Sequence, residues 1–237
     1  ARLLSKYARA VPLDNVSEVG SVSAGKPCFL VYDEERQLQA CLGEKNVQEQ
    51  DPIRLRRQIG YVIQKAGLLP HLTVAGNIGL MCRLEGWDKK RIADRVDELL
   101  TLVNMPPDQY RTRYPLELSG GQQQRVGVAR ALALDPEYIL MDEPFGALDP
   151  LTRHRLQESF IRIRRELGLT AVFVTHDMVE ALVLGDRIAV LQAGRLVQVG
   201  TPRTLMREPA NDYVRQLLDT PRREAQLVES LLAREGL

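Results

Sequence analysis

The segment LSGGQQQRVGVARAL, residues 118–132, joins a serine and two glycines to the start of a helical pattern. Ser119, Gly120 and Gly121 leave several backbone amides without partners at that helix start, where the aligned peptide dipoles favour an anion. The simpler alternative is a flexible turn before an amphipathic helix. We interpret the segment as a seat for a phosphate group.

Polar residues also follow two apolar runs of the chain. Asp142 and Glu143 come at the end of YILMDEP, and His176 comes at the end of VFVTHD. Ligands of open α/β sheets bind at the carboxyl ends of the strands, so these positions are candidates for a site. The alternatives are solvated charge for the two acids and a structural role for the histidine.

The elements that position these residues are predicted from hydrophobic patterning. The runs 28–32, 138–142 and 170–175 are apolar and rich in β-formers, as buried parallel strands are. A helix is predicted between the last two, which makes a β-α-β unit with Gly168 as the helix stop. Its apolar residues recur at helical spacing: Leu156, Phe160, Ile163 and Leu167.

Other segments complete the predicted organisation. Residues 73–115 are helical in pattern, with Thr73 and Asp88 as capping residues, and form an insertion between strands. The segment DRIAVLQAGRLVQVG predicts a hairpin at the edge of the sheet, turning at Ala193-Gly194. Beyond Pro202, RTLMREPANDYVRQLLDT and REAQLVESLLAREG each predict a helix, the second projecting beyond the core.

Bulk composition excludes several classes of protein. The chain has 237 residues, of which 44% are hydrophobic, enough for one large or two small domains. Its 32 basic and 31 acidic residues nearly cancel, which argues against nucleic acid as a partner. The three cysteines are odd in number and lack C-x-x-C spacing, so a reducing compartment fits best. No apolar run approaches the roughly 20 residues that span a bilayer.

Taken together, the motifs resemble those of the ATP-binding cassette (ABC) ATPases. LSGGQQQR is similar to the signature motif, YILMDEP to the Walker B motif, ALD to the D-loop, VFVTHD to the switch histidine segment and YVIQ to the Q-loop. They occur in the family's order from Asp51 to about Pro202. The resemblance implies an α/β fold, with a P-loop-NTPase-like core of mostly parallel sheet and a helical signature subdomain.

The resemblance also implies a role for each matching residue. Asp142 would belong to the Mg²⁺ shell, and Glu143 would be the general base for the attacking water. Gln64 would reach both Mg²⁺ and the water, and His176 would contact the γ-phosphate. Tyr7 would stack on adenine. The residues expected to bind ATP or to close over it across the dimer interface are Ser119, Gly120, Gly121, Gln122, Tyr7 and Asp149.

Within the family, residues 51–78 and the signature and Walker B segments resemble the importer ATPases for quaternary amines such as glycine betaine, choline and related osmoprotectants. The similarity extends to about Leu218. It implies ATP and Mg²⁺ as cofactors, and as partners a second ABC ATPase subunit, an integral membrane permease and, indirectly, a solute-binding protein. The expected location is peripheral, on the cytoplasmic face of the inner membrane. The loop from Gln64 to Asn77 is expected to dock on the permease.

One expected motif is missing from the sequence. The full P-loop pattern G-x-x-x-x-G-K-[ST] does not occur, because Pro27 follows the Gly25-Lys26 pair where the pattern needs Ser or Thr, although Gly20 stands five positions before Gly25. The acids Asp33, Glu34 and Glu35 stand where phosphates would lie, and they would repel a triphosphate. The domain prediction is therefore an atypical amino-terminal segment (1–50), an ABC ATPase domain (51–218) with a helical subdomain at about 73–132, and a helical tail (219–237).

Three explanations for the missing motif are open: a degenerate ATPase, a recombined or truncated reading frame, and a replaced amino end. The segment GKPCFLVYDEERQLQACLG, a strand, a turn and a strand, is also similar to half of a regulatory CBS-type module.

Two other functions stay open beside the importer ATPase: a non-hydrolysing subunit that contributes its signature in trans or regulates, and a soluble non-transport ABC ATPase. In the family, each ATP lies between the P-loop and Walker B motif of one subunit and the signature of the other. A chain without the loop can therefore still complete its partner's site.

Overall fold

The computed structural model describes residues 28–32, 38–42, 45–46, 51–64, 66–146, 148–193, 195–219 and 223. They belong to two compact units, which we describe separately: residues 51–175 form one, and the other contains the strands between residues 28 and 46 together with residues 176–219. Tyr7, the acids at 33–35 and most of the tail beyond 219 lie outside the described residues. The predicted domain boundaries stay predictions.

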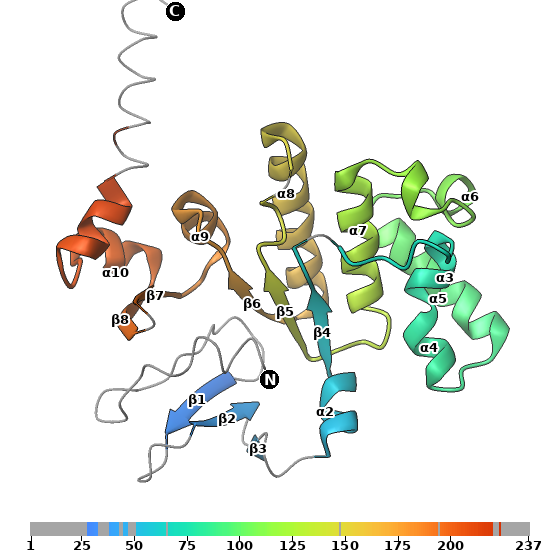
Figure 1. Cartoon of the computed structure of the whole chain (residues 1–237), viewed down its shortest axis with the longest axis horizontal. Helices are drawn as coiled ribbons and strands as arrows, with labels where there is room; N and C mark the ends of the chain where they lie inside the picture. Colours follow the sequence, from blue (N-terminus) through green and yellow to red (C-terminus); the bar gives the residue numbers. More distant parts are fainter. Residues whose placement is uncertain are drawn as a thin grey trace, which may run out of the picture. The chain divides into compact units, whose positions relative to one another are not determined.

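The unit of residues 51–175 is built on a parallel sheet. Its strands lie in the order β4 (Ile59–Val62), β5 (Tyr138–Asp142) and β6 (Thr170–Val174). Parallel neighbours need a long crossover, and helix α8 (Pro150–Leu167) supplies it between β5 and β6 (Figure 1). The structure therefore confirms the predicted β-α-β unit.

Helix α8 has the predicted buried face, except at its last residue. Leu156, Phe160 and Ile163 are buried, and the ring of Phe160 meets that of Phe173 edge-on at 5.1 Å. Gly168 ends the helix with a left-handed φ of 62°, as predicted. Leu167 shares the helical spacing of these residues but is 44% exposed, because it lies in the last turn, where the helix ends.

The predicted helical block is present and contains several short helices. Thr73 and Asp88 cap α3 and α5 as predicted, each accepting a hydrogen bond from a first-turn amide. Figure 1 shows α7, the helix with the signature sequence, between α8 and this block. The elements outside the sheet are α2 (Pro52–Arg57), α3 (Val74–Ile78), α4 (Leu80–Leu84), α5 (Lys89–Leu102), α6 (Pro107–Tyr110), the 3₁₀ helix η3 (Pro115–Glu117) and α7 (Gly120–Ala131).

Arg95 ties the block to the end of α7. Its Nη2 donates to the carbonyl of Leu132 at 2.9 Å and its Nε to that of Ala133 at 3.3 Å. It also forms salt bridges with Glu98 and Asp135. A cation is favourable at a helix carboxyl end, where the last carbonyls lack helical partners. Arg95 therefore caps α7 from a neighbouring helix.

In the other unit, the prediction for the first apolar strand needs a correction. Strand β1 (Cys28–Tyr32) forms, but it pairs antiparallel with β2 (Leu38–Leu42), which pairs antiparallel with β3 (Lys45–Asn46). It is therefore not the predicted parallel strand. Five residues separate β1 from β2, whereas a parallel connection takes about a dozen or more.

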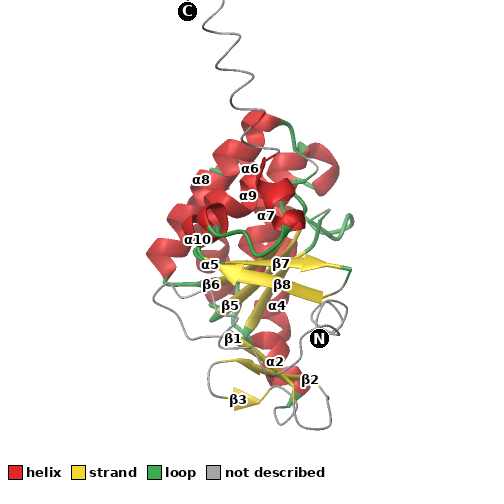
Figure 2. Ribbon diagram, turned by 90° about the vertical axis from the view of Figure 1, so that its left-hand side faces the viewer, coloured by secondary structure: helices red, strands yellow, loops and turns green. Residues whose placement is uncertain are grey.

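The predicted hairpin is confirmed, but not its position at the edge of the parallel sheet. Strands β7 (Ile188–Gln192) and β8 (Arg195–Gly200) pair antiparallel, with Ala193 in the turn at a φ of 50°. Across the described ranges they form a sheet of their own, visible as two long arrows in Figure 2. An antiparallel pair can pack on one face only, so the hairpin does not need the larger sheet.

Helices cover one face of this hairpin. Beside α9 (Met178–Leu184) and α10 (Pro202–Arg207), residues 212–219 are helical. Sequence analysis predicted one helix over the segment that includes Pro209. The segment instead contains two, because proline has no backbone N–H for a helix interior. The second predicted terminal helix lies outside the described residues, apart from Arg223.

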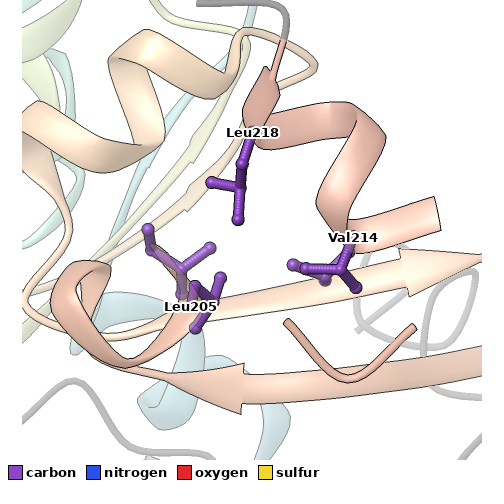
Figure 3. Packing of buried hydrophobic residues seen from close by; sticks show 5 residues of the cluster. Leu205, Val214 and Leu218 are labelled. Atoms are coloured by element: carbon purple, nitrogen blue, oxygen red, sulfur yellow. The ribbon is translucent and has the colours of Figure 1, made fainter. Parts of the chain in front are cut away.

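A small apolar core holds this part of the chain together. Leu205, Val214 and Leu218 point toward one another in Figure 3, and all three are buried. Ile188 and Val190 of β7 complete the cluster. No helix in the described parts of the chain is both long and apolar enough to cross a membrane.

We predict that Leu205→Ala destabilises the chain by about 2–5 kcal/mol, because it leaves a cavity at a fully buried site. Urea unfolding followed by circular dichroism measures the change. Arg203→Ala, an exposed position on the same helix, is the control and should change stability by less than about 0.5 kcal/mol. Equal losses in the two variants would contradict the packing role of Leu205.

Candidate functional site

The ends of β4 and β5 bring together two residues that are far apart in sequence. Val62 and Met141 are partners in the parallel ladder. Gln64 follows Val62 by two residues, and Glu143 follows Met141 by two residues. Both side chains therefore lie at the same edge of the sheet. The side-chain Nε2 of Gln64 donates a hydrogen bond to Oε2 of Glu143 at 2.6 Å. This contact orients the carboxylate at the carboxyl end of β5.

Glu143 has an unusual backbone conformation. Its φ is 43°, in the left-handed region that residues other than glycine adopt rarely and mostly where the surroundings enforce it. Its amide donates to the carbonyl of Val174 at 2.8 Å. Two positions further, Phe145 is buried and stacks on Phe173, with 6.4 Å between ring centroids. The turn after β5 is therefore held against β6 on both sides of Glu143.

Asp142 ends β5 and is half-buried. Burial raises the pKa of Tyr61 on β4, and the nearby Asp142 carboxylate raises it further. Magnesium sites in phosphate-handling proteins use one or two carboxylates together with substrate oxygens. Asp142 and the amide oxygen of Gln64 fit that donor set. In the part of the chain that the structure describes, no three His, Cys, Asp or Glu residues cluster as a closed metal cage.

The start of α7 is organised by a capping box. The hydroxyl of Ser119 accepts from the Gln122 amide at 3.3 Å, and Oε1 of Gln122 accepts from the Ser119 amide at 2.9 Å. Nε2 of Gln122 also donates to the hydroxyl of Tyr110 at 3.1 Å. Sequence analysis proposed both residues for ATP without finding this reciprocal pair. The Gly120 and Gly121 amides make no hydrogen bond with any described residue; Gly120 is exposed and is the donor open to an anion, whereas Gly121 is buried.

The two glycines have different surroundings. A Cβ on Gly121 would overlap the methyl group of Thr152 on α8, whereas one on Gly120 would meet nothing closer than Leu148 at 3.9 Å. Asp149 caps α8, and hydrogen bonds from the Thr152 backbone and side chain lower the pKa of its carboxyl group. Gly121 therefore allows α7 and α8 to approach closely, and Gly120 faces open space.

The predicted site residues thus fall into two clusters within residues 51–175. Gln64, Asp142 and Glu143 lie at the sheet edge, and the signature residues lie with Asp149 where α7 meets α8. His176 follows β6 by two residues and begins the other compact unit, so its contact with this site stays a prediction. The roles of all these residues stay predictions as well, and Tyr7 lies outside the described residues.

Sequence analysis missed Asn77, which shapes the loop after Gln64. This fully buried side chain accepts from the Leu69 amide at 2.8 Å and donates to the carbonyls of Leu69, Leu72 and Thr73. The available signal was a polar residue on the buried face of α3, beside Val74 and Ile78. The leucines expected to dock on a permease, Leu68, Leu69 and Leu72, are half-buried.

We predict that Gly121→Ala destabilises the chain by about 1–3 kcal/mol, because its methyl group would overlap Thr152. Gly120→Ala is the matched control and should be neutral or stabilising by up to about 1 kcal/mol, since it adds a helix former in open space. Thermal or urea unfolding measures both. Thr152→Ser removes the opposing methyl group and should restore most of the loss in the double variant. An equal loss in the serine background would disprove the steric explanation.

Comparison with known proteins identifies the family and the fold. The family model described as ABC transporter matches residues 27–146, which begins before the Asp51 boundary expected from the motifs. The ATP-binding cassette MJ0796, solved as a dimer in a post-hydrolysis state bound to ADP and Pi, matches with a TM-score of 0.61 and 31% identity. The match covers 70% of this chain and 74% of that one.

Three curated relatives have names that mention uptake or transport of small solutes. The glycine betaine/carnitine/choline transport ATP-binding protein OpuCA of Bacillus subtilis is 57% identical, over 75% of this chain and 47% of its own length. The choline transport ATP-binding protein OpuBA of the same organism is 55% identical, over 75% and 46%. The glycine betaine uptake system ATP-binding protein YehX of Escherichia coli is 55% identical, over 69% and 53%.

The chain spans about half the length of these relatives. The similarity is nevertheless strong in sequence and in fold. The chain belongs to the ABC transporter family, and its fold is that of an ABC ATPase.

Proposed function

We propose that the chain is an ATP-hydrolysing, energy-coupling subunit of an ABC importer for glycine betaine, choline or a related osmoprotectant. The observation that carries the proposal is the 2.6 Å hydrogen bond between Gln64 and Glu143 at the carboxyl edge of the parallel sheet. The printed functions of the relatives support the solute class. The partners would be a second ABC subunit, a membrane permease and, through it, a solute-binding protein, at the cytoplasmic face of the membrane.

In this proposal, each cluster of the site has its own task. Glu143 takes a proton from the attacking water, and the amide of Gln64 holds the carboxylate in place. Asp142 and Gln64 would hold the Mg²⁺ that accompanies ATP, and this ion would neutralise charge on the phosphates. The Gly120 amide binds a phosphate oxygen of an ATP held by the partner subunit, as donors at a helix start do.

A second candidate function is favoured by one observation in the sequence. The segment from Gly20 to Lys26 lacks the Ser or Thr that ends the P-loop pattern, because Pro27 follows Lys26, and acids occupy positions 33–35. In this alternative, the chain hydrolyses nothing at its own Glu143 and completes a partner's site with its signature. The working site then takes its P-loop and general base from the partner and its signature from this chain.

Two variants in an assembled complex distinguish these functions. If the chain's own site works, Glu143→Gln should leave ATP binding intact and lower turnover by about 10²–10⁴-fold, the usual contribution of a general base. If only the signature works, Glu143→Gln should have no effect. Gly120→Asp should then abolish turnover, because it places a negative charge at the phosphate donors. Steady-state phosphate release from complexes with a P-loop-bearing ABC subunit and permease measures both.

Each outcome of that experiment is informative. Gly120 has open space around it, so the aspartate is not expected to disturb folding. If Gly120→Asp abolishes turnover and Glu143→Gln leaves it unchanged, the first proposal is overturned and the second is favoured. A complex that forms but hydrolyses no ATP with this chain in wild-type form would contradict both.

We also predict that the 237-residue chain alone binds Mg·ATP weakly. The reason is that Pro27 stands where the P-loop pattern needs Ser or Thr, and that the acids at 33–35 would repel a triphosphate. Isothermal titration calorimetry should give a dissociation constant well above micromolar. Micromolar affinity, about −8 kcal/mol, would show that phosphate is held by residues other than a P-loop.

A further inference from the structure

Arg130, in the last turn of α7, holds the loop that follows Gln64. Its Nη1 donates to the carbonyl of Gly67 and its Nη2 to the carbonyl of Ala66, both at 2.7 Å. Two nitrogens of one planar group on two successive carbonyls fix the direction of the loop as well as its position. The contact joins residues that are 63 and 64 positions apart.

The arginine is committed to these two carbonyls. Burial lowers the pKa of the Arg130 guanidinium, which still carries its charge at neutral pH. Among the residues that the structure describes, Arg130 makes no salt bridge, so its charge is compensated by the two carbonyls. Hydrogen bonds with an ionised donor are shorter and stronger than neutral ones. The loss of this donor would leave a conformation that the loop itself does not favour.

The loop conformation needs such support. Ala66 and Gly67 both have left-handed φ values, 52° and 53°, and this region is unfavourable for an alanine. Ala66 is buried against Gly127, where an added Cβ would lie 3.2 Å from the Ala66 methyl carbon. Gly127 and Arg130 are three positions apart and therefore share one face of α7. That face provides both the space for Ala66 and the donors for its carbonyl.

The carbonyls that Arg130 binds lie close in sequence to Gln64, which contacts Glu143 at the edge of the sheet. Gln64 precedes Ala66 by two residues, and its side chain contacts Glu143. At the other end of the loop, Asn77 binds the backbone of Leu69. Glu143 itself is held by β6 through its amide. The loop is therefore held by α7 near Gln64 and by α3 further along.

We infer that Arg130 is a positioning residue that, by fixing the carbonyls of Ala66 and Gly67, places the side chain of Gln64 on Glu143. The effect on hydrolysis rests on the proposed function, whereas the positioning itself does not.

The direct test uses the full chain without nucleotide. With [¹⁵N]glutamine labelling, the Gln64 side-chain amide gives an NMR signal that Gln64→Met identifies. Glu143→Ala provides the signal of a Gln64 that has lost its acceptor. In Arg130→Met, the signal should move most of the way to that reference. Arg125→Met is the matched control, because Arg125 also lies on α7 but donates to the Asn104 carbonyl, away from the loop.

Hydrogen exchange checks that the variants fold and that the loop opens. The Ala66 amide donates to Ile63 at 3.1 Å, and its exchange should rise by roughly tenfold or more in Arg130→Met. The Gln123 amide, which donates to Ser119 in the first turn of α7, should be unchanged. Arg130→Lys keeps the charge but cannot span both carbonyls, so it should restore part of both signals. An unmoved Gln64 signal, or equal shifts in Arg125→Met, would overturn the inference.

Turnover in the assembled complex separates this inference from the proposed function. If the chain's own site hydrolyses ATP, Arg130→Met and Gln64→Ala should each lower turnover, and the double variant should be no slower than the slower single one. Independent, multiplying losses would overturn the link to hydrolysis. In a complex without turnover at this site, the proposed function fails, and the NMR signal alone decides whether Arg130 positions Gln64.

Discussion

Strand β5 is the element on which the unit of residues 51–175 depends. It pairs with β4 on one side and β6 on the other, so its backbone polar groups are used within the sheet. Residues 138–141 are buried, so water reaches neither an edge nor a face of the strand there. Such a strand tolerates only apolar residues until it ends. The first charged groups therefore come at Asp142 and Glu143, and a register slip of one residue would turn them to the wrong faces.

Helix α7 connects the elements around this sheet to the helical block. Its carboxyl end is capped by Arg95 of α5, and its amino end packs against α8 through Gly121. Arg130 links it to the loop after β4. One helix therefore contacts every layer of the unit, and its glycines and arginines serve packing and placement at once.

The sequence predicted those features that depend on local pattern. The caps at Thr73 and Asp88, the helix stop at Gly168 and the strand that ends in Asp142 each follow from residue types a few positions apart. The hydrogen bond from Arg130 to the carbonyl of Ala66 could not be predicted in this way. A side chain that binds a distant backbone carbonyl leaves no periodicity, because any residue type can supply that carbonyl.

The direction of β1 shows a different limit of sequence reasoning. An apolar run of β-formers indicates a strand, but it says nothing about the partner or the direction of pairing. The short separation between Tyr32 and Leu38 was the better guide, since it allows an antiparallel neighbour only. The reciprocal cap between Ser119 and Gln122 was readable in principle, because the S-x-x-Q spacing is its signature.

At Glu143, the left-handed backbone favours glycine for folding stability, whereas the proposed catalytic role requires a carboxylate. A glycine would adopt this φ without steric cost, so the native side chain is present despite the backbone it must occupy. A library randomised at this codon and screened only for heat tolerance would therefore enrich glycine and lose the carboxylate. The same library screened for the proposed ATP hydrolysis should retain the carboxylate. The difference in folding stability between the two selected populations would measure how much stability the glutamate costs.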